Sequence, residues 1–106
     1  MTEFIKHDGD KPRPELLPPA ALMAISEVLA TGARKYDDNN WMHTPGYSRY
    51  YGAALRHLLA WWGGEDLDPE TGLHHLAHAG CCVLFMLELI ERNRLDIDDR
   101  PKVHDE

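Results

Sequence analysis

Only two cysteines occur in the 106 residues of the sequence, and these two, Cys81 and Cys82, are adjacent in the chain. Neighbouring cysteines inside a helical pattern cannot form an ordinary structural disulfide, because that bond needs two separated backbone positions. The sequence also lacks an apolar run of about eighteen residues and the pattern of a signal peptide. We therefore expect a soluble, cytoplasmic protein whose fold depends on neither disulfides nor a membrane.

Positive charge is scarce as well. Lys and Arg number 11 and Asp and Glu number 18, which gives a formal net charge of −7. Binding to the backbone of DNA or RNA depends mainly on Lys and Arg that displace counterions. The composition thus argues against a nucleic-acid polymer as a partner, whereas a small anion held through a metal remains compatible with it.

The length and the apolar spacing predict a single all-α domain over residues 1–106. Residues 1–19, with four prolines, are expected to form an irregular arm. The helical core should cover residues 20–93, with helices over 20–36, from 47 or 48 to 62, and from 69 to about 93. Asp68 is the expected N-cap of the third helix, with Pro69 in its first position. Residues 94–106 form a charged tail that we expect to fray.

The third predicted helix is apolar nearly all round beyond Ala79. Large apolar side chains and Cys82 point in different directions around its axis, and they include Val83, Phe85, Met86 and Leu89. A chain with only three helices has too few partners to cover such a surface. We therefore expect a homo-oligomer, a dimer or a tetramer, with this helix at its centre.

Four of the seven histidines fall between residues 57 and 78, and four carboxylates lie among them. His75 and His78 are three residues apart and His74 and His78 are four apart, so either pair can share a helix face. Taken singly, these residues are better explained as helix caps or hydrogen-bonded core histidines. As a group they indicate a metal site, because burying histidines beside carboxylates is costly without a cation or hydrogen-bond partners.

Two further stretches suit a nucleotide. Cations bind phosphates, an aromatic plane stacks on a base and an amide can recognise a base edge. These residue types occur in the arm and at the end of the first predicted helix. The candidate substrate-binding residues are Lys11, Arg13, Lys35, Tyr36, Asn40 and Trp41.

Three segments in succession also resemble a known family. They are "DGDKPRPELLPPAAL", "TGARKYDDNNW" and "RYYGAALRHLLAWWGGEDLDPETGLHHLAHAGCCVLFMLEL". Their order is similar to that in the bacteriophage dATP/dGTP diphosphohydrolase family, which includes the MazZ-type nucleotide pyrophosphohydrolases related to MazG. The resemblance implies a MazG-like helical bundle whose subunits pair through helices. It also implies hydrolysis of dGTP or dATP to the monophosphate and pyrophosphate, in the host cytoplasm if the protein is phage-encoded.

The ligand set departs from that of MazG-like enzymes, which commonly bind Mg²⁺ through an E-x-x-E pair on one helix and an E-x-x-D pair on the next. Here the third predicted helix has His75-x-x-His78 instead. Imidazole suits Mn²⁺, Co²⁺ or Zn²⁺, whereas Mg²⁺ prefers oxygen. The candidate metal ligands are Glu65, Asp68, Glu70, His75 and His78. The metal would activate a water for attack on the α-phosphorus, and the candidate catalytic residues are Glu65, Arg56 and His57.

Two other functions are compatible with the sequence. One is an HD-type nucleotide phosphohydrolase, which requires His-Asp pairs, but the two pairs present, His7-Asp8 and His104-Asp105, lie in the arm and the tail. The other is a non-catalytic regulatory oligomer that binds nucleotide or metal. The product released from a nucleoside triphosphate distinguishes all three.

Overall fold

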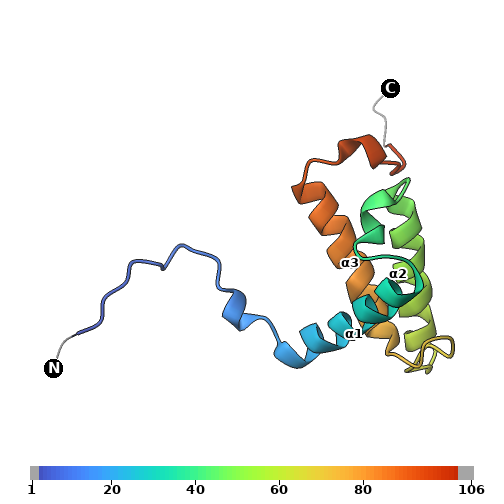
Figure 1. Cartoon of the computed structure of the whole chain (residues 1–106), viewed down its shortest axis with the longest axis horizontal. Helices are drawn as coiled ribbons and strands as arrows, with labels where there is room; N and C mark the ends of the chain where they lie inside the picture. Colours follow the sequence, from blue (N-terminus) through green and yellow to red (C-terminus); the bar gives the residue numbers. More distant parts are fainter. Residues whose placement is uncertain (1–2, 103–106) are drawn as a thin grey trace.

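A computed structural model describes residues 3–102, and it has three α-helices, in agreement with the predicted all-α bundle (Figure 1). The helices are α1 (Pro19–Lys35), α2 (Tyr47–Trp62) and α3 (His75–Glu91). Three short 3-10 helices, η1 (Pro14–Leu16), η2 (Asn40–His43) and η3 (Leu95–Ile97), lie between or beyond them. Within the described residues no strand forms, and the one β-bridge joins Leu67 and His74.

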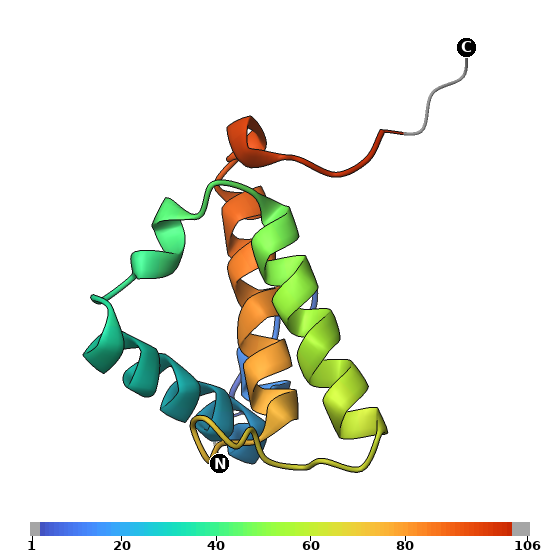
Figure 2. The same ribbon diagram turned by 90° about the vertical axis from the view of Figure 1, so that its right-hand side faces the viewer.

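Helices α2 and α3 lie side by side and antiparallel, and α1 crosses α3 near its start (Figures 1 and 2). The crossing depends on Gly80, because a Cβ atom there would lie 3.0 Å from Cδ1 of Ile25 on α1. None of the helices in residues 3–102 is both long and apolar enough to span a membrane.

The core lies where the start of α2 meets the end of α3. Tyr47, Leu89 and Ile97 form a buried cluster, and Trp41 and Met86 pack against it. The Tyr47 hydroxyl donates a hydrogen bond to the carbonyl of Arg94 at 2.9 Å. Ile97 is buried in the same core and Asp99 accepts a hydrogen bond from Ser48 N, so the prediction that the tail frays is wrong for residues 94–99. His104 and Asp105 lie outside the described residues.

Helix α3 begins at His75, so the prediction that it starts after Asp68 is wrong. The Asp68 carboxylate does accept a backbone hydrogen bond, from Glu70 N at 2.7 Å, but this closes a turn and not a helix. Gly72 has a φ of +72°, a left-handed conformation that ends any helix begun at Pro69. The resulting loop over residues 63–74 folds back across the start of α3 (Figure 2).

Part of the apolar surface of α3 is covered within one chain and part of it stays exposed. Cys82 and Leu89 are buried, and Met86 packs on the core. Among the side chains that remain exposed is a set on α2 and α3 that we call the open apolar face. Its members are Tyr51, Leu55, Leu58, Trp62, Val83, Leu87 and Ile90. The stripes of the two helices meet at a small apolar cavity lined by Tyr51, Met86 and Ile90.

Candidate functional site

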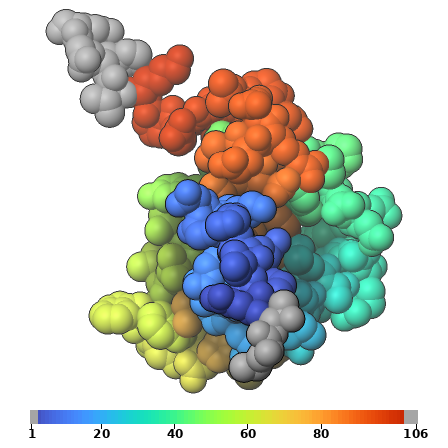
Figure 3. Space-filling model, turned by 90° about the vertical axis from the view of Figure 1, so that its left-hand side faces the viewer, coloured from blue at the N-terminus to red at the C-terminus, as the bar shows by residue number. Residues whose placement is uncertain are grey.

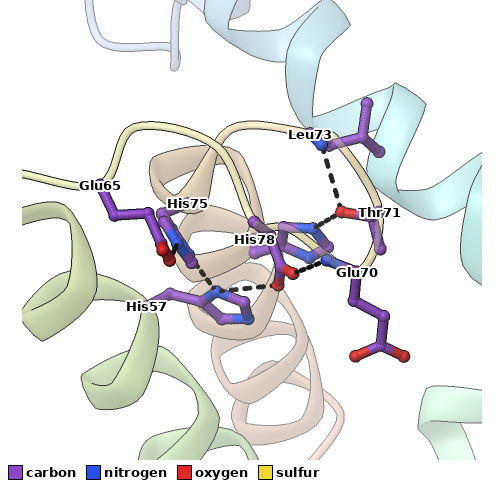
Figure 4. A network of polar contacts seen from close by, with 8 residues as sticks. His57, Glu65, Glu70, Thr71, Leu73, His75 and His78 are labelled. Atoms are coloured by element: carbon purple, nitrogen blue, oxygen red, sulfur yellow. Dashed lines mark hydrogen bonds and ion pairs between the residues drawn. The ribbon is translucent and has the colours of Figure 1, made fainter.

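The antiparallel pairing of α2 and α3 brings a group of polar side chains together at one end of the bundle (Figure 4). His57 comes from the second half of α2, and His75 and His78 come from the first turn of α3. Glu65 and Asp68 come from the connecting loop, whose backbone is held by a hydrogen bond from His75 N to the carbonyl of Asp66 at 2.9 Å. Five residues that the sequence places in a 22-residue stretch are therefore in one cluster.

Glu65, His75 and His57 form a chain of hydrogen bonds. His75 Nε2 lies 2.6 Å from Glu65 Oε1, and His75 Nδ1 lies 2.9 Å from His57 Nδ1. Because a carboxylate only accepts, His75 donates through Nε2, and with neutral rings its Nδ1 accepts from His57 Nδ1–H. This arrangement leaves the Nε2 lone pair of His57 free, whereas His57 Nδ1, the nitrogen 3.7 Å from Asp68, carries the proton, so a cation bound at Nδ1 would take the place of that proton and of the hydrogen bond to His75.

His57, Asp68 and His78 are arranged as ligands of a single ion. One ligand atom from each lies within 4.8 Å of the other two. The His57 and His78 rings stack with centroids 4.5 Å apart and an interplanar angle of 8°, and the Asp68 carboxylate is 3.7 Å from His57 Nδ1. Two imidazoles and one carboxylate form a donor set that suits a divalent cation, so the residues present fit the metal implied by the sequence.

The protonation states favour cation binding. Burial lowers the pKa of His57 below its ordinary value, and a neighbouring imidazole, His78, lowers it further. Burial likewise lowers the pKa of His78, although the Asp68 charge opposes this. For Asp68 burial acts to raise the pKa, but the Glu70 N–H bond and the nearby histidines outweigh burial and hold it below its usual range. Neutral imidazoles beside an ionised carboxylate are the forms that bind metal.

Thr71 also belongs to the cluster, although it was not among the residues predicted for the site. Its Oγ1 lies 2.7 Å from His78 Nε2 and accepts a hydrogen bond from Leu73 N at 3.2 Å (Figure 4). The hydroxyl therefore fixes the plane of the His78 ring. Nothing in the sequence pattern marks this threonine, because its role depends on the turn at Gly72.

Other predicted site residues lie outside the cluster. The Glu70 side chain points away from the histidines and forms an exposed ion pair with Lys35 at 3.4 Å (Figure 4). Arg56 is exposed on α2. His74 is also exposed, in the N-cap position of α3.

A cavity of about 800 Å³ lies between the end of α1, η2 and α3. Its lining includes three residues that were predicted to bind the sugar and the base, Tyr36, Asn40 and Trp41. One face of Trp41 already stacks on Phe85, with centroids 5.1 Å apart and an interplanar angle of 7°. Tyr36 is more than half exposed and follows Lys35, which is paired with the loop of the cluster. No residue of the cluster lines the cavity, but the two are linked through Lys35 and along α3, where Cys81 of the cavity wall lies three residues after His78.

Lys11 and Arg13 are distant from both features. They lie in the N-terminal arm, which projects away from the helical body (Figure 1). His7 and Asp8 are exposed in the same arm, apart from the cluster.

Fold and site together define an all-α protein with a mixed imidazole and carboxylate cluster beside a large cavity. The chain belongs to the family described as dATP/dGTP diphosphohydrolase, N-terminal, whose model matches residues 3–100, and this confirms the resemblance seen in the sequence. A dATP/dGTP diphosphohydrolase of Salmonella phage PMBT28 is 38% identical over 96 residues, which are 91% of this chain and 32% of the relative. The chain thus spans about a third of that relative's length. No solved structure matches it.

Proposed function

We propose that the protein is a metal-dependent pyrophosphohydrolase that converts dGTP or dATP to the monophosphate and pyrophosphate. The observation that carries the proposal is the His57, Asp68 and His78 cluster beside a cavity large enough for a nucleoside. The name of the phage relative supports the substrate class. Family membership and the geometry of this chain therefore favour the same reaction.

His57, Asp68 and His78 would hold the divalent metal, and Glu65 and His75 would orient His57. Mn²⁺ and Mg²⁺ are the first candidates. Co²⁺ and Zn²⁺ are included as well, because two of the ligands are imidazoles, which suit these metals. When bound, the metal would supply charge neutralisation and Lewis acidity at the triphosphate. Glu70 could join this group only if its pair with Lys35 opened, and that exposed pair is weak.

The nucleoside would occupy the cavity, with Tyr36 and Asn40 at the sugar and base. Lys35 precedes Tyr36 of the cavity wall, pairs with Glu70 of the loop and would bind a phosphate oxygen. Trp41 would form the wall behind the base, held by Phe85. Arg56, exposed on the helix that carries His57, is a further candidate for a phosphate. Water adds to the α-phosphorus, and the bond from that phosphorus to the bridging oxygen breaks to release pyrophosphate.

The test is to incubate the purified chain with dGTP or dATP and Mn²⁺ and to identify the products. We expect the monophosphate and pyrophosphate in equal amounts, with no activity after chelation of the metal. Release of inorganic phosphate or triphosphate would favour the HD-type alternative instead. Nucleotide binding without any product would favour the non-catalytic regulatory alternative.

We also propose that the chain is a homo-oligomer that pairs through the open apolar face. Burying each large apolar side chain is worth about 1.5 to 3 kcal/mol, so leaving this face in water is costly. Light scattering at micromolar concentration is expected to give a mass of at least two chains. Leu87→Glu should reduce that mass to one chain, whereas Leu95→Glu, at an exposed site that is not part of the face, should not. A monomeric wild type would contradict the proposal.

A further inference from the structure

The N-terminal arm stands apart from the rest of the molecule. Residues 3–18 are exposed throughout and extend to one side of the bundle (Figure 1), so that they stand in front of it when it is viewed from that side (Figure 3). The radius of gyration is 17.7 Å, whereas a compact domain of about 100 residues has a value of about 13 Å. The arm therefore covers little of its own body.

The polar contacts of the arm are internal. Arg13 pairs with Glu15 at 2.9 Å, and the backbone bonds of Lys11 and Leu16 go to Asp8 and Arg13. Three prolines between residues 12 and 18 restrict the backbone to extended conformations and turns. Within the described residues, none of the side-chain hydrogen bonds or ion pairs of the arm reaches the body of the chain.

The arm nevertheless carries groups that need a partner. Phe4, Ile5, Leu16 and Leu17 are all more than half exposed. Within the described part of the chain, Lys11 has no ion pair, and the Arg13 pair is exposed and weak. Both cations are therefore free to bind another anion.

The loop over residues 63–74 is negatively charged, opposite in sign to Lys11 and Arg13 of the arm. It contains Glu65, Asp66, Asp68 and Glu70 and neither Lys nor Arg. A bound triphosphate would add further negative charge at the same place. The cation seen at this loop is Lys35, which already pairs with Glu70. The loop is thus deficient in the positive charge that a triphosphate requires.

We infer that the arm of one copy crosses to a second copy and places Lys11 and Arg13 beside the His57, Asp68 and His78 cluster of that copy, where they bind the substrate triphosphate. The inference rests on the proposed function for the identity of the anion. From Pro18 to Lys11 the arm reaches at most about 19 Å, at about 2 Å per residue through η1 and about 3.3 Å per residue elsewhere. That reach is sufficient to cross onto a second body packed beside the first. Pairing also covers the apolar groups of the arm, which a single chain leaves in water.

The decisive test is complementation between two inactive variants. One copy carries Lys11→Ala and Arg13→Ala, and the other carries His78→Ala. Each variant alone is expected to lose at least about 90% of dGTP hydrolysis with Mn²⁺, as loss of charged phosphate contacts or of a metal ligand should cause. The two are then co-expressed with different tags, and the mixed dimer is isolated by two affinity steps. Because the first copy keeps its cluster and the second keeps its arm, we expect about half of the wild-type activity, from one complete site in two.

The reciprocal mixture places all three substitutions on one copy and pairs it with a wild-type copy. If the arm acts across the interface, this dimer is inactive, because the one intact cluster receives the altered arm. If the arm acts within its own chain, this dimer keeps about half of the activity and the first mixture has none. That second pattern, or full activity of the Lys11→Ala and Arg13→Ala protein, would overturn the inference.

A second measurement does not depend on catalysis. Lys11→Cys on one tagged copy and Glu70→Cys on the other are treated with a short bismaleimide. Cys81 and Cys82 are buried, and burial raises the pKa of the Cys81 thiol to about 12, so they should not compete. A covalent link between the two chains is expected, whereas its absence would overturn the arm exchange. If the link forms but wild-type protein releases no pyrophosphate, it is the proposed function that fails.

Discussion

Asp68→Asn is expected to lower the kcat for pyrophosphate release by about 100-fold or more. Loss of a group that merely supports a metal ligand costs about 10- to 100-fold, and Asp68 is in the position of a ligand. Asparagine keeps an oxygen that can accept the hydrogen bond from Glu70 N, so the turn should survive. The substitution removes the negative charge of Asp68 beside His57.

The measurement combines steady-state kinetics with Mn²⁺ binding by calorimetry and helical content by circular dichroism. We expect both turnover and metal affinity to fall while the helical signal stays constant. His74→Ala is the matched control, because His74 lies beside the cluster in the sequence but is exposed and outside it. Equal loss in both variants, or wild-type metal affinity of Asp68→Asn, would remove the metal assignment.

Leu89→Ala is expected to cost about 2 to 5 kcal/mol of unfolding free energy. Leu89 is 1% exposed and packs with Tyr47 and Ile97 at the point that joins α2, α3 and the segment after α3. The cavity left by the missing atoms cannot easily collapse, since three elements meet there. Against a typical domain stability of about 5 to 15 kcal/mol, this is a large fraction.

Urea unfolding followed by circular dichroism measures this loss. Leu95→Ala provides the control, because Leu95 is 66% exposed and its truncation should change stability by less than about 0.5 kcal/mol. A shift in the midpoint without a change in slope would show that Leu89→Ala alters stability alone. If the two variants unfold at the same urea concentration, the core does not lie at Leu89.

The sequence predicted which residues form the cluster better than it predicted how their side chains are arranged. His57, Glu65, Asp68, His75 and His78 were all named as site residues, and the structure brings them together. The outward direction of Glu70 and the role of Thr71 could not be predicted. Both depend on the turn closed by Gly72, because that turn directs the Glu70 side chain away from the cluster and the Thr71 side chain toward it.

The sequence by itself determined the positions of α1 and α2 and the all-α class. Apolar spacing, prolines at the first turn and paired glycines at the end act locally, so their effect can be recognised along the chain. Predicted bounds of 20–36 and of 47 or 48 to 62 differ by one residue or less from Pro19–Lys35 and Tyr47–Trp62.

Only the tertiary structure decided where α3 begins and what covers its end. Asp68 and Pro69 have the local signature of a helix start. The loop is nevertheless favoured over a helix that begins there, because it forms hydrogen bonds to α3 and contains Gly72 in a left-handed conformation. The tail looked too charged to pack, yet Ile97 fills the site beside Leu89 and Asp99 accepts hydrogen bonds from Ser48. The contacts between Ser48 and Asp99 join residues 51 positions apart, and a pattern confined to neighbouring residues cannot specify them.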